Sequence, residues 1–407
     1  MSVLVEQVVL PGRAGLKHWR GGKEYMKIVD IIPHVLSTPL EEPFSFSQGW
    51  VDKRSTMIVE VLTDEGVTGW GESLCHGLQP PEVAASFVEF CFKPMLVGRD
   101  PFDVEVLWEE AYNRTRPFGG GAAVNAMSGV DIALWDVIGR CLDRPVHKLL
   151  GGAFRSEVTP YATGFYRREG QNYVEAGVEE ASRHLSEGFK AMKLKIGFGV
   201  EADLEYVHAV REAVGPGVRL MMDANCAYDV PAARRLLLEC RDADVHFFEE
   251  PLAPEDLEGY RALRNLSATY VAAGENLFGK IGYRRWVSEG ALDILQPDLC
   301  SSGGFTECKK IAAVAQAWTT AVIPHVWGSG IGLAASLQFI ATLPPTPLSL
   351  NPEESMLEYD RSSHPFREDL IGGAISTVNG KVPVPQGPGI GVEVDRGVLE
   401  RYGKPFR

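Results

Sequence analysis

The second half of the chain alternates short apolar segments with amphipathic ones, and this alternation constrains the fold more than any other feature. From Val158 onward, seven apolar stretches of strand length recur, and each is followed by roughly 10–20 residues of helical character. Parallel strands need crossover connections of about this length. Seven strand–helix units in series predict an α/β fold, a (β/α)7–8 barrel of the TIM type, better than they predict an open sheet. The seven stretches are VTPYAT, AMKLKI, VRLMMDA, VHFFEE, YVAAGE, ALDILQP and TAVIPH.

The residues before Val158 follow another pattern. Residues 26–36 and 55–71 have the composition of strands, an acidic-Gly turn divides the second run, and a turn-rich aromatic loop lies between them. Residues 81–150 place apolar side chains at three- and four-residue spacing, as helices do. We therefore predict an α+β capping domain over 26–150, the barrel over 151–350, and a segment over 351–407 that returns to complete the capping domain. Residues 1–25 form an extension, or the natural start is Met26.

Charge and composition exclude several classes of function. The formal net charge is −14, so neither nucleic acid nor an anionic membrane surface is an expected partner. No run approaches the ~20 apolar residues of a membrane span, and the first residues lack the features of a signal peptide. Seven dispersed cysteines, with no CxxC pair, fit reduced thiols and a cytoplasmic location. A small anionic substrate remains compatible with this charge.

Three carboxylates stand at the ends of three successive predicted strands: Asp223, Glu249 and Glu275. Their intervals are equal, since 249 − 223 and 275 − 249 are both 26. The C-terminal ends of barrel strands meet at one mouth, so this spacing brings the three anions together. Oxygen ligands alone predict a hard divalent cation, Mg²⁺ first and Mn²⁺ or Ca²⁺ next. Each acid alone would more often cap the next helix. Asn225 and Glu250 flank the site, as supporting partners or as solvated surface residues.

Lys193 and Lys195 lie on the strand before Asp223. Side chains on a strand alternate with period two, so both lysines point the same way. If they point into the mouth, like charge and partial burial depress their pKa values toward neutrality, which makes a general base. The alternative is an edge strand with two solvated lysines, which the apolar neighbours Met192 and Ile196 disfavour.

Two later strand ends supply Asp298 and His325, one strand–helix unit apart. A carboxylate bonded to Nδ1 fixes the imidazole tautomer and leaves Nε2 for catalysis, although a lone histidine at a strand end is more often structural. Glu358 is a weaker candidate, as a protonated hydrogen-bond donor to an enolate or as a plain surface residue. Gly328, Gly330 and Gly332 have the wrong spacing and position for dinucleotide binding, and are predicted to let the backbone approach the substrate or start a helix.

With these residues assembled, the chain resembles the enolase superfamily, in particular its mandelate racemase subgroup. The motifs that carry the resemblance are KLK, DAN, EEP, GEN, QPD and PHVWG. The resemblance implies Mg²⁺ held by Asp223, Glu249 and Glu275. It also implies Lys195 as one acid/base and the His325–Asp298 pair as the other, with Lys193 stabilising the enediolate.

The segments YATGFYRREG, DILQPDLCSSGGF and NPEESMLEYDRSSHPFR are similar to the galactarolactone cycloisomerases. This resemblance implies an acid sugar or lactone as substrate and ring opening by β-elimination to a 3-deoxy-2-keto acid. It also implies that specificity resides in the loop from Leu40 to Arg54. Trp50, Arg54 and Trp327 are candidate substrate contacts, although either tryptophan is equally compatible with the core.

Other functions stay open at this point. A dehydratase of a linear acid sugar and a racemase or epimerase of a 2-hydroxy acid need the same catalytic residues. A non-enzymatic descendant on the same fold is disfavoured by the complete set of ligands and bases. A homo-oligomer, from dimer to octamer, is expected.

Overall fold

The computed structural model describes residues 25–266, 268–347, 349–404 and 406. The predicted extension over 1–25 therefore lies outside the described residues, except for Tyr25. Within the described residues, no helix is both long and apolar enough to cross a membrane. All seven cysteines are free thiols.

Eight parallel strands form one curled sheet, which confirms the predicted α/β barrel class. Their order is β11-β10-β9-β8-β7-β6-β5-β12, and among the described residues the end strands β11 and β12 are not paired with each other. The strands are β5 (Pro160–Thr163), β6 (Ala191–Lys195), β7 (Arg219–Asp223), β8 (Val245–Glu249), β9 (Tyr270–Ala273), β10 (Ile294–Leu295), β11 (Ala321–Val322) and β12 (Leu357–Asp360).

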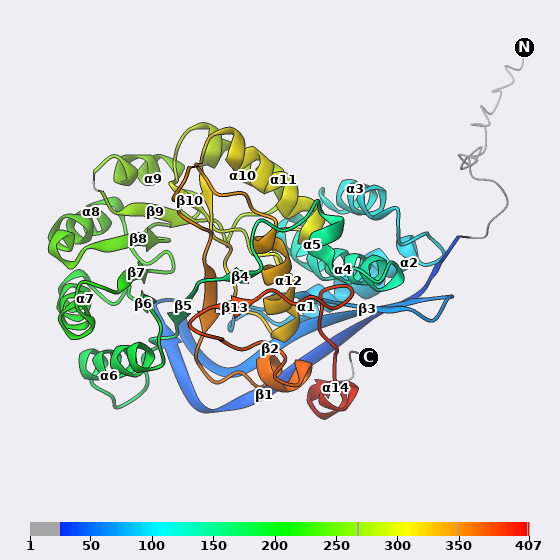
Figure 1. Ribbon diagram of the computed structural model, residues 1–407, viewed down its shortest axis with the longest axis horizontal. Coiled ribbons are helices and arrows are strands. Elements are labelled where there is room, and N and C mark those ends of the chain that lie inside the picture. Colours follow the sequence, from blue (N-terminus) through cyan, green and yellow to red (C-terminus); the bar gives the residue numbers. More distant parts are fainter. Residues whose placement is uncertain (1–24, 267, 348, 405, 407) are drawn as a thin grey trace, which may run out of the picture.

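The strands read as continuous apolar runs because both of their faces are buried. One layer inside the barrel takes a residue from each strand or its edge: Tyr161, Ala191, Met221, Phe247, Ala272, Ile294, Ile323 and Met356. Helices cover the outside of the sheet (Figure 1). These are α6 (Tyr173–Ser186), α7 (Val200–Val214), α8 (Val230–Glu239), α9 (Leu257–Arg264), α10 (Gly279–Ser288), α11 (Gly304–Ala317) and α12 (Gly330–Ala341).

The capping domain is an antiparallel sheet packed on helices. Its strand order is β14-β1-β2-β3, with β1 (Ile28–Phe46), β2 (Gly49–Thr63), β3 (Thr68–Ser73) and β14 (Gly403–Lys404). Its helical elements are α1 (Pro81–Phe87), the π-helix Val88–Phe92, α2 (Lys93–Leu96), α3 (Val104–Thr115), α4 (Gly120–Cys141) and α5 (Val146–Leu149). Strand β3 packs tightly on α4, since a Cβ at Gly71 would lie 1.9 Å from the carbonyl oxygen of Gly129.

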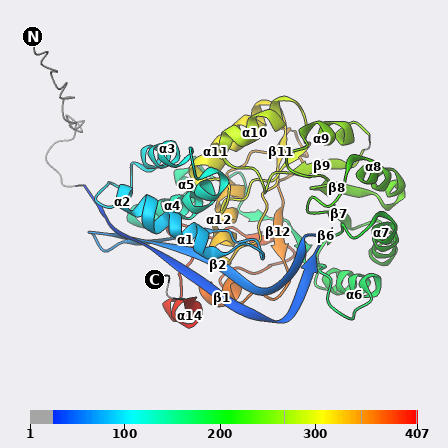
Figure 2. The ribbon, with the colours of Figure 1, turned by 180° about the vertical axis from the view of Figure 1, so that it is seen from behind.

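Residues 40–50, predicted as a loop, are instead the tip of a long hairpin. Strand β1 continues to Phe46 and β2 begins at Gly49. The tip reaches the C-terminal ends of the barrel strands, as Figure 2 shows from behind. There Ser45 pairs with Arg167 of the β5–α6 loop, and Ser47 Oγ donates to the carbonyl of Ala224 at 2.7 Å. The hairpin therefore forms one wall of the barrel mouth.

The C-terminal segment contributes strands to both the barrel and the capping domain. Residues 357–360 form β12, which pairs with β5 in the barrel, so the barrel sheet extends beyond residue 350. The chain then runs through α13 (Pro365–Glu368), the 3₁₀-helix Asp369–Ile371, and β13 (Val382–Pro383), which pairs with β4 (Glu157–Val158). Finally α14 (Arg396–Tyr402) leads into β14, which adds to the capping sheet beside β1.

Glu72 of the capping domain joins the two parts. This buried carboxylate accepts hydrogen bonds from the backbone N–H groups of Ser329 and Gly332 and from Ser329 Oγ, at the start of α12. A Cβ at Gly328 or Gly332 would lie within 3.0 Å of Glu72 oxygens. The glycine cluster therefore starts a helix, as one of its two predicted roles required, and its backbone approaches Glu72.

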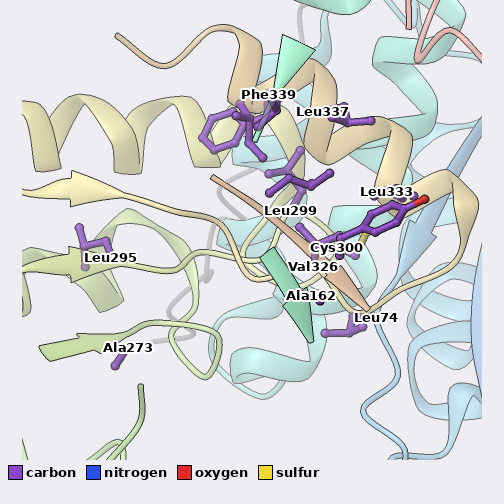
Figure 3. Close-up of a cluster of buried hydrophobic side chains, with 14 of the residues drawn as sticks. Leu74, Ala162, Ala273, Leu295, Leu299, Cys300, Val326, Leu333, Leu337 and Phe339 are labelled. Atoms are coloured by element: carbon purple, nitrogen blue, oxygen red, sulfur yellow. The ribbon is translucent and has the colours of Figure 1, made fainter. Parts of the chain in front are cut away.

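Apolar packing continues across the same junction. Leu74 of the capping domain belongs to a core cluster that includes Cys300, Val326 and Leu333 of the barrel (Figure 3). Its N–H donates to the carbonyl of Cys300 at 2.9 Å. The segment that follows β3 is thereby attached directly to the barrel mouth.

Candidate active site

The predicted site residues lie at the C-terminal edge of the barrel sheet. Lys195 is in register with Asp223, and Asp223 with Glu249, so three adjacent strands end at one level. Glu275 follows β9 by two residues. All four side chains are buried. The spacing in the sequence thus corresponds to one cluster in space.

Lys193 and Lys195 both point into this cluster, as predicted. Lys193 Nζ lies 2.5 Å from Glu249 Oε1 and 2.7 Å from Glu358 Oε1. Lys195 Nζ lies 2.5 Å from Asp223 Oδ2 and 3.0 Å from Asn225 Oδ1. The lysines thus lie among carboxylates, and each is held as an ion pair.

The predicted depression of the lysine pKa values is wrong for this arrangement. Burial lowers the pKa of both ammonium groups, but the surrounding carboxylates raise it more, so both pKa values lie above their ordinary value. Like charge between the two lysines and their burial are evident from the sequence. The attraction of Asp223, Glu249 and Glu358, which lie on other strands, arises only in the folded protein and outweighs both effects.

Acidic side chains outnumber basic ones at this site. Burial raises the pKa of Glu249 to about 8; Lys193 opposes this, while Asp223 and Glu358 add to it. Glu275 Oε2 is buried and faces His325 Nε2 at 3.3 Å without a hydrogen bond of good geometry. Six carboxylates surround three cationic side chains (Lys193, Lys195 and His325), and the six are Asp223, Glu249, Glu250, Glu275, Asp298 and Glu358. This excess of acidic side chains, which supply hard oxygen donors, fits a bound cation.

In the described part of the chain, no three His, Cys, Asp or Glu side chains are already arranged as an open metal-binding cluster. The physical reason is local: the two ammonium groups stand between the carboxylates and supply the countercharge. Gln296 also occupies one of the carboxylate oxygens, since its Nε2 donates a hydrogen bond to Glu249 Oε2 at 2.5 Å.

Asp298 and His325 form the predicted pair. Asp298 Oδ2 lies 2.7 Å from Nδ1 of His325, and both side chains are buried. His325 Nε2 points to the carboxylate cluster, 3.3 Å from Glu275 Oε2. Burial lowers the pKa of His325, but Glu275, Glu358 and Asp298 together raise it to about 10.

Glu358 is not a surface residue, and its predicted protonated state is wrong. It lies on β12, buried, where Oε2 accepts a hydrogen bond from the N–H of Val326 at 3.0 Å. Burial raises its pKa, but the charges of Lys193 and then His325 lower the pKa by more. The net shift is downward, and the group is ionised. Glu358 is therefore a partner of Lys193 rather than a hydrogen-bond donor.

Asn225 and Glu250 are buried beside the ligand candidates, which excludes the solvated alternative. Glu250 accepts a hydrogen bond from Asn276 Nδ2 at 2.8 Å, and burial followed by the charges of Glu275 and Asp223 raises its pKa well above the usual range. Both residues have positive φ, 44° at Asn225 and 40° at Glu250. Such strained backbone commonly accompanies functional sites.

The three candidate substrate contacts have different surroundings. Trp50 is 52% exposed on the wall of a cavity of about 510 Å³ beside the hairpin tip, so it is not a core residue. Trp327 is partly buried and donates to the hydroxyl of Tyr166 at 2.7 Å. Arg54 is buried beneath Trp327, 4.5 Å from its ring, and donates to the carbonyl of Ser363. Arg54 lines neither of the two cavities beside the mouth, and its contact with substrate stays a prediction.

A smaller cavity of about 290 Å³ opens directly onto the carboxylates. It is lined by Phe46, Gln48, His76, Leu78, Gln79, Asn225, Glu275 and Asn276. The hairpin tip and the segment after β3 therefore close the mouth from the capping side. A cavity of about 520 Å³ at the N-terminal ends of the strands lies away from this chemistry.

Two residues at the mouth were not identified from the sequence. Gln296 could have been found, since it precedes Asp298 by two positions and period two gives both the same direction. His76 has no such signal, because it follows a strand of the capping domain and its neighbourhood depends on how the two domains pack.

Two family models match the chain, one over most of the barrel and one over the capping domain. Residues 176–398 match the model described as enolase C-terminal domain-like. Residues 30–151 match the mandelate racemase / muconate lactonizing enzyme N-terminal domain. Together these matches cover the capping domain and most of the barrel, so the chain is an enzyme that belongs to the enolase superfamily.

Individual relatives narrow the comparison to proteins that process acid sugars. The chain is 42% identical to a D-galactarolactone cycloisomerase of Agrobacterium fabrum over 93% of this chain and all of that protein. It is 32% identical to an arabinonate dehydratase of Saccharolobus solfataricus over 84% and 89% of the two chains.

Solved structures agree with this fold. The crystal structure of a 3,6-anhydro-D-galactonate cycloisomerase from Zobellia galactanivorans superposes with a TM-score of 0.83 at 38% identity, covering 93% of this chain and 99% of that one. A racemase from Streptomyces coelicolor with bound magnesium superposes with a TM-score of 0.82 at 28% identity, covering 93% and 100%.

Proposed function

We propose that this protein removes the proton next to the carboxylate of an aldaric-acid lactone and opens the ring by β-elimination to a 3-deoxy-2-keto acid. One observation carries the proposal. Lys195 at the end of β6 and the His325–Asp298 pair after β11 reach the same carboxylate cluster from strands far apart in the sheet order. One of two acid/base groups on either side of a site can remove the α-proton, and the pair suits elimination as well as racemisation.

Asp223, Glu249 and Glu275 would hold Mg²⁺, or Mn²⁺, because they supply hard oxygen donors and excess negative charge. When bound, the ion supplies positive charge where the substrate carboxylate becomes an enediolate. The magnesium in the structural relative from Streptomyces coelicolor supports this assignment. The same carboxylates raise the pKa values of the lysines, so the lysines' strength as bases depends on whether these oxygens are otherwise engaged.

The protein's own groups divide the chemistry. Asp298 bonds to Nδ1 of His325 and directs Nε2 toward the site. The neighbouring carboxylates favour the charged imidazole, so His325 takes the α-proton at Nε2 in the neutral form, which is favoured once those carboxylate oxygens are otherwise engaged. Lys195 serves the opposite face, and Lys193, held by Glu249 and Glu358, contributes positive charge to the enediolate. The electrons of the broken C–H bond then form the Cα=Cβ bond as the Cβ–O bond breaks, and the resulting enol becomes the ketone.

The choice of a lactone rests on the leaving group and on the relatives. In a lactone the departing oxygen becomes a carboxylate, which needs no proton from the enzyme, whereas a hydroxyl must be protonated as it leaves. Both the curated relative at 42% identity and the structural relative at 38% are cycloisomerases. The dehydratase at 32% identity supports a second candidate, loss of water from a linear acid sugar by the same residues. Racemisation would follow on a substrate without a β-leaving group.

Incubation with galactaro-lactone, followed by NMR, tests the proposal. The expected result is a new methylene at C3 in a product of unchanged mass. The same assay with linear aldarates and aldonates is the comparison. Turnover confined to the linear substrates, with loss of water, would instead establish the dehydratase.

We further propose a cytoplasmic homo-oligomer, between dimer and octamer. Seven free thiols support a reducing compartment. Large exposed aromatic side chains on the capping domain, Phe90 and Phe118, support contact with another copy of the chain. Light scattering during size-exclusion chromatography would measure the mass, and a monomer at micromolar concentration would contradict the proposal.

A further inference from the structure

His76 lies opposite the acid/base pair, although it belongs to the capping domain. Its ring centroid is 6.0 Å from that of His325, and the two planes are inclined by 28°. It lines the cavity of about 290 Å³ that also contains Glu275 and Asn225. No catalytic role described above uses this imidazole.

The backbone on both sides of His76 is fixed. Leu74 donates its N–H to the carbonyl of Cys300 and lies in the apolar cluster of Figure 3. Gly77 allows a close approach, since a Cβ there would lie 2.6 Å from Val51 and 3.3 Å from Trp327. The carbonyl of His76 accepts a hydrogen bond from the N–H of Gln79. The imidazole is therefore presented to the cavity from a rigid segment, as a group that binds a ligand must be.

The electrostatic state of His76 suits a hydrogen-bond donor rather than a proton donor. Burial first, and then the charge of His325, lower its pKa to about 4. A neutral imidazole offers one N–H and one acceptor nitrogen. Two rings 6.0 Å apart can contact atoms of one substrate that are separated by one or two bonds. An oxygen on the β-carbon is two bonds away from the α-carbon.

We propose that His76 donates a hydrogen bond to the lactone oxygen that leaves the β-carbon, while His325 acts at the α-carbon. This inference rests on the proposed lactone opening and adds the residue that recognises the leaving oxygen. That oxygen becomes part of a carboxylate, so a donor that keeps its proton is sufficient. Charge on the oxygen grows as the C–O bond breaks, and the hydrogen bond therefore strengthens in the transition state.

The test separates the two halves of the reaction. The His76→Phe variant should eliminate about 10- to 100-fold more slowly than the unaltered protein, as expected for loss of one hydrogen bond to a developing charge. Its abstraction of the α-proton should persist, so in D₂O deuterium should enter the recovered lactone. His76→Gln, which keeps an N–H donor, should recover part of the elimination rate. His208→Phe, the same change at a histidine outside the site, is the matched control.

The outcomes distinguish the inference from the function on which it rests. If the unaltered protein does not open the lactone, both fail. If it does, and His76→Phe eliminates at the same rate, only the role of His76 is contradicted. An equal fall of deuterium exchange and elimination in His76→Phe would also contradict it, because that result indicates a merely structural role.

Discussion

The ammonium groups of Lys193 and Lys195 lie among the carboxylates that are the proposed metal ligands. Their pKa values follow from these neighbours: burial alone would favour the neutral amines, whereas Glu249 and Asp223 hold the charged forms. The pKa values of the two lysines therefore depend on whether a cation competes for the carboxylate oxygens.

Glu249→Gln should bind Mg²⁺ much more weakly, because an amide oxygen carries no charge and Glu249 stands at the centre of the cluster. Chelation with EDTA should abolish turnover of the unaltered protein, and Mg²⁺ should restore it. Mg²⁺ at about 100 times its dissociation constant should add about 2.7 kcal/mol to the unaltered protein's stability, and much less to the variant's. Titration calorimetry and thermal unfolding measure both effects. Glu258→Gln, at an exposed position, is the control, and full activity after chelation would end the metal assignment.

Replacement of either acid/base group should stop turnover without unfolding the protein. Lys195→Ala and His325→Ala should each lose about 10²- to 10⁴-fold in rate, the usual contribution of a general acid or base. One of the two should retain exchange of the α-proton in D₂O, because a single group abstracts it. Lys190→Ala, at the exposed position just before the same strand, is the matched control. Normal turnover by both variants would show that the bases are elsewhere.

At the scale of elements, carboxylates of the capping domain hold the N-termini of barrel helices. Glu72 holds the start of α12, and Asp131 on α4 accepts the N–H of Thr306 in the first turn of α11 at 3.0 Å. Burial raises the pKa of Asp131 to about 7, and its hydrogen bonds from Thr306 offset only part of that effect. The junction of these helices therefore depends on pH.

Asp131→Asn should remove part of the protein's pH dependence of stability. The folded-state pKa of Asp131 lies above its unfolded value of about 3.9. Between about pH 4 and 7 the folded protein therefore keeps a proton on Asp131 that the unfolded chain has released. Stability from this group is therefore complete below about pH 4 and is lost as pH rises toward 7. The unaltered protein should lose about 1.4 kcal/mol per pH unit relative to the variant over this window. Urea unfolding of both proteins at pH 5 and 7 measures the difference, and parallel pH dependences would contradict it.

Across the whole molecule, the capping domain and barrel share contacts at several places. Trp108 on α3 donates its indole N–H to the carbonyl of Gly303, and β14 returns the end of the chain to β1. Leu74 belongs to the barrel core cluster. We therefore expect the two parts to unfold together, although each has its own apolar core.

Calorimetry should show one unfolding transition, coincident with fluorescence and circular dichroism. Trp108→Phe should lower the stability of the whole transition by about 1 kcal/mol or more, since the change leaves the carbonyl of Gly303 without its donor. Trp318→Phe, at a residue that is 56% exposed, should change it little. Two separate transitions, with only one of them sensitive to Trp108, would show that the domains fold independently.

The sequence by itself determined the barrel class, the gathering of the carboxylates at one end of the barrel strands, and the fact that both lysines point the same way. These features follow from local periodicity: each strand–helix unit repeats the same geometry, so equal spacing in the chain becomes adjacency at one edge of the sheet. The pairing of His325 with Asp298 follows from the same regularity, one unit apart.

Only the tertiary structure decided the remaining features. The eighth strand, the ionised state of Glu358, the raised pKa values of the lysines and the position of His76 all depend on residues far apart in the chain. A proton affinity is a sum of burial and of every nearby charge, and a strand as short as β12 is stabilised by its partner rather than by its own composition. Such properties belong to the packed neighbourhood, which local sequence patterns do not encode.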